Sequence, residues 1–228
     1  MQIVILAGGL GTRLRPLTEK VPKPMLEVCG KPFLEHLLEL VKSYGLNDIL
    51  ILAGYLGEKI EERFGNSREM GLNITYSFEK TPMGTGGALK FAQDLLEDRF
   101  ILLNGDTLLP IDYLDLAEEF IRRNCRAMIV AYDNALKIVA NNLRVSGGGV
   151  VLSYNKDNPD DMTHLDAGVI ALHKSVIDLI PASMVCSFER EVFSRLIKSG
   201  DMTAYVTSMR FYDMGTFTGL NEIARVLK

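Results

Sequence analysis

Short apolar runs alternate with helix-like segments along the first 131 residues, and this alternation limits the possible folds more than any other feature of the chain. The runs at residues 2–7, 48–53 and 100–103 are typical of buried strands, and residues 32–44 and 112–123 carry apolar side chains at helical spacing. Weaker signals of the same two kinds predict helices at 56–64 and 85–96 and strands at 72–78 and 127–131. Because the connections are short, the sequence predicts an α/β fold: a Rossmann-like, mostly parallel central sheet with helices on both faces.

The pattern changes after about residue 132. Runs at 143–145 and 150–154 flank Ser146-Gly-Gly-Gly149, which predicts a β-hairpin. Further strands are expected at 166–172 and 203–207, and further helices at 188–199 and 217–227. No internal repeat or low-complexity linker interrupts the chain. We therefore expect one domain, residues 1–228, whose second half (about 132–228) adds a small β-subdomain to the first half (about 1–131).

Composition excludes several classes of protein. The chain has 228 residues, 47% of them hydrophobic, which is enough for one sizeable core. A net charge of −4 argues against a general nucleic-acid binder. No apolar stretch approaches the roughly 20 residues of a membrane span, and the first strand lacks the charged segment of a signal peptide. The sequence predicts a cytoplasmic protein that binds neither nucleic acid nor membranes.

The three cysteines, Cys29, Cys125 and Cys186, are scattered and form no CxxC pair. They indicate neither a zinc site nor a disulfide framework. We expect small core residues in a reducing compartment.

A glycine-rich loop, LAGGLGTRLRPLTEKVPKPM, begins where the first strand ends. Ligands of open α/β sheets bind beyond the carboxyl ends of the strands, and glycines let backbone N–H groups approach phosphate oxygens. The P-loop pattern GxxxxGK[ST] is absent, and the dinucleotide pattern GxGxxG fails because Leu14 stands in place of its third glycine. The glycines therefore predict an anion site of another kind.

Four cations, Arg13, Arg15, Lys20 and Lys23, follow the glycines. Such charge suits a triphosphate whose leaving group carries several negative charges. The alternative is a solvated basic loop that makes surface ion pairs. Two prolines flank Lys23 and stiffen its backbone, which suits a cation that must meet developing charge, although the same pair could simply form a bend.

These segments together resemble the sugar-1-phosphate nucleotidyltransferases, or nucleoside-diphosphate-sugar pyrophosphorylases. The resemblance rests on Gly8-Gly-Leu-Gly-Thr-Arg-Leu-Arg-Pro-Leu-Thr18 and Pro22-Lys-Pro-Met25. Four further matches arrive in family order: Glu79-Lys-Thr-Pro-Met-Gly-Thr-Gly-Gly-Ala88, Asn104-Gly-Asp-Thr107, Asp166-Ala-Gly-Val169 and Phe211-Tyr-Asp-Met-Gly-Thr216. The chain is most similar to the mannose- and heptose-1-phosphate guanylyltransferase-like branch. The resemblance implies the nucleotide-diphospho-sugar transferase fold, with a nucleotide-binding first half and a sugar-binding second half.

The resemblance also implies the reaction. Members join a nucleoside monophosphate from an NTP to a sugar 1-phosphate and release pyrophosphate, with Mg²⁺ present. It assigns Arg13, Lys23 and Asp106 to catalysis, and Asp106 and Asp213 to Mg²⁺, which takes only one or two carboxylates. Either aspartate alone could instead cap a turn.

Two further sets of site residues follow from the resemblance. The nucleotide-binding residues would be Leu6, Ala7, Gly8, Gly9, Gly11, Thr12, Arg13, Glu79, Gly84 and Thr85. The sugar-phosphate-binding residues would be Lys23, Asn142, Lys156, Asp166 and Glu189.

Glu79 bears on the choice of base. A carboxylate only accepts hydrogen bonds, and guanine offers two adjacent donors where uracil and thymine offer one. In uridylyl and thymidylyl relatives the matching position is often Gln. Glu79 therefore favours GTP, unless it is merely an exposed charge at the end of a strand.

Sugar recognition is where the match loosens. Asn155 stands where the family often has a sugar-binding Glu, and Asp166 stands where Asn is common. Asn141-Asn142 occupies the place of a Tyr-Gly pair. Ser187-Phe-Glu-Arg190 is similar to a stretch in relatives that act on heptose or mannose phosphates. Glu189 either accepts from a sugar hydroxyl or lies in the first turn of a helix, where acids are favoured.

The preferred hypothesis is guanylyl transfer to a manno-configured hexose or heptose 1-phosphate. One alternative is uridylyl, thymidylyl or cytidylyl transfer to another sugar 1-phosphate. Another is a non-catalytic subunit that senses nucleotides or sugar phosphates, although the presence of Arg13, Lys23, Asp106 and Asp213 argues against it. Either a monomer or a homodimer is compatible with the sequence.

Overall fold

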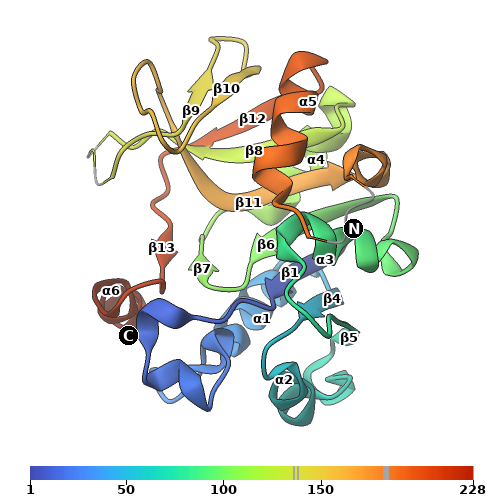
Figure 1. Ribbon diagram of the computed structural model, residues 1–228, viewed down its shortest axis with the longest axis vertical. Helices are drawn as coiled ribbons and strands as arrows, with labels where there is room; N and C mark the ends of the chain where they lie inside the picture. The colour runs from blue at the N-terminus through green and yellow to red at the C-terminus, as the bar shows by residue number, and fades with distance from the viewer. Residues whose placement is uncertain (136, 138, 182–184, 228) are drawn as a thin grey trace. The chain divides into compact units, whose positions relative to one another are not determined.

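The computed structural model describes residues 1–135, 137, 139–181 and 185–227 (Figure 1). Within these residues, seven strands form one sheet in the order β12-β8-β11-β6-β1-β4-β5. Their bounds are β1 (Gln2–Ala7), β4 (Asp48–Ala53), β5 (Asn73–Phe78), β6 (Arg99–Asn104), β8 (Ala127–Tyr132), β11 (Leu165–His173) and β12 (Met202–Thr207). Three two-stranded sheets pair β2 (Glu27–Val28) with β3 (Lys31–Pro32), β7 (Thr107–Leu108) with β13 (Tyr212–Asp213), and β9 (Leu143–Val145) with β10 (Val151–Tyr154).

The helices lie at the predicted positions. They are α1 (Phe33–Ser43), α2 (Gly57–Phe64), α3 (Gly84–Phe91), α4 (Tyr113–Arg123), α5 (Ser194–Lys198) and α6 (Phe217–Val226). Two of them, α3 and α5, are shorter than predicted. Among the described residues, no helix has both the length and the apolar character needed to cross a lipid bilayer. The expected α/β fold with a mostly parallel sheet is confirmed.

Internal contacts divide the chain into two compact units. Unit 1 contains Met1–Pro82, Leu103–Leu108 and Tyr212–Lys228, and unit 2 contains Met83–Leu102 and Leu109–Phe211. This is a division by contacts, whereas the expected halves (about 1–131 and 132–228 of one domain) differ by what they bind and stay a prediction. Periodicity reports local structure only, so it cannot show that the short segments Leu103–Leu108 and Tyr212–Lys228 pack with the first 82 residues.

In unit 1, three parallel strands end together. Ala7 of β1 pairs with Ala53 of β4, which pairs with Phe78 of β5. The next residue of each strand is therefore Gly8, Gly54 or Glu79. The sequence places two glycines and one carboxylate along the edge where ligands of parallel sheets bind.

The charged loop of unit 1 rests on a hydrophobic cluster. Leu14 is fully buried and packs in a core that includes Phe33 of α1, Leu108 of β7 and Ile223 of α6. Burying one such leucine stabilises the fold by about 1.5–3 kcal/mol. The loop is therefore anchored at its middle rather than free in solvent.

In unit 2, β8 is paired on both sides. β12 runs parallel to it, and β11 runs antiparallel with a shift of register between Asp166 and Ile170. Such bulges redirect side chains and occur often beside functional sites. The predicted hairpin is present as β9 and β10, whose turn contains Ser146 to Gly149.

Two expected helices differ in detail. The helix expected at 85–96 ends at Phe91 and continues as a 3₁₀ turn, Gln93–Leu95. The helix expected at 188–199 begins as a π-helical segment, Glu189–Phe193, before α5. Both regions keep their buried apolar side chains, so the hydrophobic pattern was right while the hydrogen-bond spacing was not readable from it. The two-residue strands were too short to predict.

Candidate active site

Glu79 lies against two glycines at the strand edge of unit 1. Its backbone N–H donates to the carbonyl of Ala53 at 2.9 Å. A Cβ placed on Gly8 or Gly54 would come within 2.8 or 2.7 Å of Glu79 Oε1. Only residues without a side chain leave room for the carboxylate here. Glu79 and the glycine loop thus meet at one place, as the sequence analysis required for a nucleotide site.

The loop after the glycines has a fixed shape. The hydroxyl of Thr18, itself buried, donates to the carbonyl of Gly11 at 2.8 Å, and the N–H of Leu14 donates to the same carbonyl at 2.9 Å. Thr12 and Arg13, by contrast, are exposed. The loop therefore holds its backbone rigidly while the guanidinium of Arg13 remains accessible to an anion.

Lys23 is a buried cation on a rigid mount. Its residue is only 8% exposed and begins a 3₁₀ turn, Lys23–Met25, that is closed by a 2.8 Å hydrogen bond from Met25 N–H to Pro22 O. The amine Nζ donates to Oδ2 of Asp106. The sequence analysis gave these two residues separate partners, whereas the structure pairs them with each other.

Asp106 is brought beside the end of β1 by the glycine before it. Gly105 N–H donates to Leu6 O at 2.9 Å, and a Cβ on Gly105 would lie 2.5 Å from that oxygen. The Thr107 hydroxyl donates to the other carboxylate oxygen of Asp106 at 3.2 Å. No larger residue could replace Gly105 without moving Asp106 away from β1.

A short β-ladder brings Asp213 to the same place. Asp213 of β13 pairs with Thr107 of β7, and Met214 N–H donates to the backbone carbonyl of Asp106 at 3.0 Å (Figure 1). A Cβ on Gly215 would lie 2.8 Å from Asp213 Oδ1 and 2.9 Å from Arg13 Nη2. Unit 1 therefore gathers two cations and two carboxylates in one cluster, which we call the charge cluster: Arg13, Lys23, Asp106 and Asp213.

The electrostatics of the charge cluster suit a divalent cation. Burial raises the pKa of Asp213, and repulsion from the carboxylate of Asp106 raises it further, against the opposing effect of Lys23. Two hard oxygen donors that repel each other are the kind of ligand set that Mg²⁺ uses together with water. In the described ranges, no group of three or more His, Cys, Asp or Glu side chains is placed to hold a metal. The pair Asp106 and Asp213 fits an ion that keeps most of its waters.

In unit 2, Glu189 is held by two hydroxyl groups. Its Oε2 accepts from Thr85 Oγ1 at 3.0 Å and from Ser187 Oγ at 2.7 Å. Thr85 is itself fixed, because its oxygen accepts from Phe188 N–H at 2.8 Å. Two neutral donors thus orient one oxygen of this half-buried carboxylate.

A second carboxylate of unit 2 is held by the backbone. Asp166 Oδ1 accepts from Gly168 N–H at 2.9 Å, and the Asp166 N–H donates to Oδ1 of the buried Asn142 at 2.8 Å. The Tyr154 hydroxyl lies 3.4 Å from Asp166 Oδ2, and the Lys156 amine lies 5.6 Å from the centre of the Tyr154 ring. Burial raises the pKa of Asp166, and Glu189 adds to the rise, against the opposing effects of Gly168 N–H and Lys156.

A hollow of about 440 Å³ in unit 2 contains several of these groups. Its walls include Tyr154, Lys156, Ser187, Glu189 and Phe193. Sequence reasoning missed Tyr154, although its position directly before Asn155-Lys156 at the end of the hairpin was a usable signal. The ring of Phe193 packs edge-on against Tyr154 at 4.9 Å and fixes its orientation.

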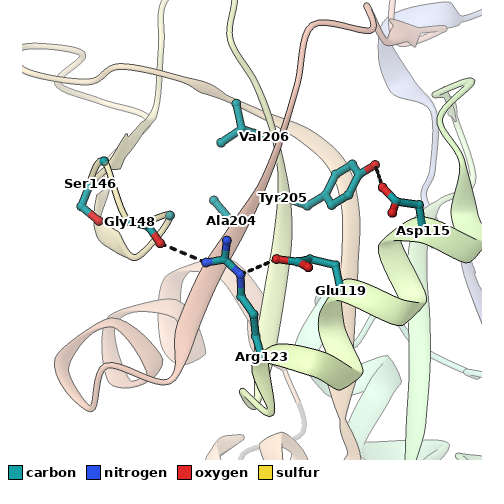
Figure 2. A pocket seen from close by; sticks show the side chains of 10 residues that line it. Asp115, Glu119, Arg123, Ser146, Gly148, Ala204, Tyr205 and Val206 are labelled. Carbon is teal, nitrogen blue, oxygen red and sulfur yellow. Dashed lines mark hydrogen bonds and ion pairs between the residues drawn. The ribbon is translucent and has the colours of Figure 1, made fainter.

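Unit 2 has another hollow, of about 400 Å³, whose charged walls are already paired. Figure 2 shows Arg123 between Glu119 and Gly148: its Nε donates to Glu119 Oε1 at 2.6 Å and its Nη1 to Gly148 O at 3.0 Å. Tyr205 donates to Asp115 Oδ2 at 2.5 Å. The bond to Gly148 fastens the hairpin turn to α4, and the bond from Tyr205 fastens β12 to the same helix. None of the site residues expected from the sequence lines this hollow.

The structure thus sorts the expected site residues into two groups. Unit 1 holds Leu6, Ala7, Gly8, Gly9, Gly11, Thr12, Arg13, Lys23, Glu79, Asp106 and Asp213. Unit 2 holds Gly84, Thr85, Asn142, Lys156, Asp166 and Glu189. Gly84 and Thr85 were assigned to the base, and their contacts within unit 2 are with Cys186 and Glu189. The three cysteines are free thiols, but only Cys186 is buried: Cys125 is partly exposed and Cys29 is exposed, so the prediction of core residues is wrong for Cys29.

Comparison with known proteins also identifies nucleotidyltransferases as relatives of this chain. The family model described as nucleotidyl transferase matches residues 2–228. A mannose-1-phosphate guanylyltransferase of Mycobacterium tuberculosis is 36% identical over 231 residues, covering 93% of this chain and 60% of that protein. A D-glycero-alpha-D-manno-heptose 1-phosphate guanylyltransferase of Aneurinibacillus thermoaerophilus is 29% identical, covering 94% of this chain and 93% of that protein.

Solved structures agree. HddC from Yersinia pseudotuberculosis, complexed with GMP-PN, matches with a TM-score of 0.85 at 28% identity, covering 100% of this chain and 99% of that chain. The chain thus spans under two thirds of the length of the mycobacterial relative and nearly the whole of the other two proteins. The match over residues 2–228 establishes that the chain belongs to the nucleotidyl transferase family.

Proposed function

We propose that this chain transfers a guanylyl group from GTP to a manno-configured hexose or heptose 1-phosphate and releases pyrophosphate. The charge cluster of unit 1 beside the Gly8–Gly54–Glu79 edge is the observation that carries the proposal. In this reaction a phosphate oxygen of the sugar 1-phosphate bonds to the α-phosphorus as the bond to the β-phosphate oxygen breaks. All the reacting groups are anionic, so catalysis depends on positioning and charge neutralisation. Such charged substrates do not cross membranes readily, which suits a cytoplasmic reaction.

In the proposal, unit 1 binds the triphosphate. The backbone N–H groups after β1 approach the phosphates, the exposed Arg13 holds the departing pyrophosphate, and Lys23 stabilises charge at the reacting phosphate. Members of the family generally use a divalent metal ion. We assign Mg²⁺ to Asp106 and Asp213, where it would neutralise phosphate charge.

Glu79 supports the choice of GTP. Its carboxylate sits against Gly8 and Gly54, so the base site is lined by backbone and by a group that only accepts hydrogen bonds. The adjacent N–H donors of guanine match such a group, and uracil offers a single donor. Relatives named as guanylyltransferases act on mannose 1-phosphate and on a manno-heptose 1-phosphate.

Unit 2 supplies groups suited to a sugar. Glu189 and Asp166 are oriented by hydroxyl and backbone donors, which leaves their remaining lone pairs for sugar hydroxyls. Lys156 provides the cation that a sugar phosphate needs.

Pyrophosphate release tests the proposal directly. We would assay GTP, UTP, CTP, ATP and dTTP with Mg²⁺ against mannose, glucose, N-acetylglucosamine and manno-heptose 1-phosphates. Release with GTP and a manno-sugar only is the expected result. Release with UTP and glucose 1-phosphate would overturn the assignment of substrates, and binding without release in any combination would indicate a sensing subunit.

Glu79→Gln tests the base assignment within the same assay. Replacing one acceptor oxygen with a donor should lower kcat/KM for GTP about tenfold relative to UTP, since a hydrogen bond to a charged group contributes about 1.5–3 kcal/mol. Glu58→Gln, an exposed glutamate of α2, is the matched control and should leave the ratio unchanged. An unchanged ratio for Glu79→Gln would remove Glu79 from the base site.

A further inference from the structure

The Lys23–Asp106 ion pair puts a cation on an atom that the proposed metal would also need. Lys23 Nζ contacts Oδ2 of Asp106, and the other oxygen of that carboxylate already accepts from Thr107. Asp213 likewise has one oxygen, Oδ1, occupied by the N–H of Gly215. A metal ion shared by the two aspartates therefore competes with the lysine for Asp106 Oδ2.

We propose that Lys23 is an internal counterion that holds Asp106 before metal binds and is displaced onto the nucleotide phosphates when metal arrives. Metal and nucleotide then bind together, and metal alone binds weakly. This inference rests on the metal role proposed above, and it gives Lys23 a function in binding order in addition to its function at the reacting phosphate.

The mount of Lys23 allows such an exchange. The backbone of the residue is fixed between two prolines, and a Cβ on Gly11 would lie 3.3 Å from Lys23 Cβ. The stem therefore starts from a fixed point, and only the long, flexible end of the side chain can move. The side chains of Lys23 and Asp106 are 10% and 30% exposed, so solvent screens their interaction only partly.

Charge explains why the metal alone is disfavoured. The charge cluster has two basic and two acidic side chains, so its formal charges sum to zero. A divalent cation added alone leaves the cluster with an excess of two positive charges at short range. A polyphosphate that enters with the metal offsets this excess and gives the displaced amine a new partner.

Binding of Mn²⁺ to the nucleotide-free protein tests the exchange. Lys23→Met removes the charge and keeps the length of the stem, so its Mn²⁺ affinity should exceed that of the wild type by on the order of tenfold. Lys31→Met is the matched control, because Lys31 pairs with Glu39 elsewhere in unit 1. It should leave Mn²⁺ affinity unchanged. Equal or weaker Mn²⁺ binding by folded Lys23→Met would overturn the proposal.

A measurement on the wild-type protein makes the test independent of folding of the variant. Acetylation of lysine amines by a small reagent, read by mass spectrometry, should be slow at Lys23 and should become several-fold faster with saturating Mn²⁺ alone. Lys31 provides the internal reference. Unchanged or slower labelling of Lys23 with Mn²⁺ would overturn the exchange. If the wild type bound no Mn²⁺ even with GTP, the proposed metal site at Asp106 and Asp213 would be wrong. If it bound Mn²⁺ with GTP but Lys23 labelling did not increase, only the displacement of Lys23 would be wrong.

Discussion

The two units hold their carboxylates in opposite ways. In unit 1, Asp106 pairs with the buried cation Lys23. Burial raises the pKa of Asp213, and Lys23 and Arg13 lie close enough for both positive charges to oppose that rise. In unit 2, Glu189 and Asp166 are held by hydroxyl and backbone donors that carry no charge. The cation that acts on Asp166, Lys156, belongs to an exposed residue.

This difference fits the ligands that the proposed function gives to the two units. The paired charges of unit 1 can exchange partners when a metal ion and a polyphosphate bind: the metal ion replaces Lys23 at Asp106, and the phosphates replace Asp106 at Lys23. Carboxylates held by neutral groups need no rearrangement of charge to accept further hydrogen bonds, which suits the hydroxyls of a sugar. Under the proposed function, the same residue type serves phosphate transfer in one unit and sugar recognition in the other.

The largest effect on turnover should come from removing the buried amine of Lys23 in unit 1. Lys23→Ala should lower turnover by about 10²–10³-fold, the usual cost of losing one donor to developing charge. The melting temperature should fall by only a few degrees. Steady-state kinetics and a thermal melt measure the two effects, and Lys31→Ala controls for loss of a paired lysine. Turnover within a few-fold of wild type would remove Lys23 from the reaction.

Gly105→Ala in unit 1 should lower the stability of the protein more than Gly147→Ala in unit 2. A Cβ at Gly105 would lie 2.5 Å from Leu6 O, whereas a Cβ at Gly147 in the hairpin turn has nothing within 4 Å. Gly105→Ala should cost about 1–3 kcal/mol of unfolding free energy and should weaken Mn²⁺ binding by moving Asp106. Gly147→Ala should change neither quantity. Equal urea midpoints for the two variants would contradict the close approach of Gly105 to β1.

Loss of one hydroxyl should weaken sugar binding without affecting the nucleotide. Thr85→Val removes a donor to Glu189, so the KM for the sugar phosphate should rise about tenfold, with the KM for GTP unchanged. Thr85→Ser keeps the hydroxyl and should restore the wild-type value. A rise in the KM for GTP instead would return Thr85 to the base site that the sequence suggested.

The smallest effect concerns the charge of Asp166. Burial raises its pKa, so the folded chain binds a proton there more readily than the unfolded chain. The wild type therefore loses stability as pH rises from the ordinary aspartate pKa through the raised one. Asp166→Asn removes this loss and can still accept from Gly168 N–H. The variant should melt about 2 °C higher near pH 8 and show no gain near pH 3. A gain that is independent of pH would contradict the burial of this charge.

Much of the fold could be predicted because its strands are buried on both faces. The run at residues 48–53 has five buried residues and reads as a strand from composition alone. The π-helical start at Glu189–Phe193 could not be read, since its apolar pattern is compatible with an ordinary helix. The two expected halves were inferred from a change of pattern near residue 132. The long-range contacts that group Tyr212–Lys228 with the first 82 residues leave no local pattern in the sequence.

The site residues could be named from motifs, but their pairing could not. Lys23 and Asp106 are 83 positions apart, and nothing local to either one indicates that they touch. Similarly, the Thr85 hydroxyl donates to Glu189, which lies 104 positions away along the chain. Motifs report residue types near one strand end, whereas pairing depends on how distant segments pack.

The division of work between the units is the central claim, and one measurement addresses it most directly. We would titrate Glu189→Gln by calorimetry with GTP and Mg²⁺, and separately with whichever sugar 1-phosphate supports pyrophosphate release. The account predicts wild-type affinity for GTP and about tenfold weaker binding of the sugar phosphate, the cost of one hydrogen bond to a charged group. Weakened GTP binding with wild-type affinity for the sugar phosphate would contradict it.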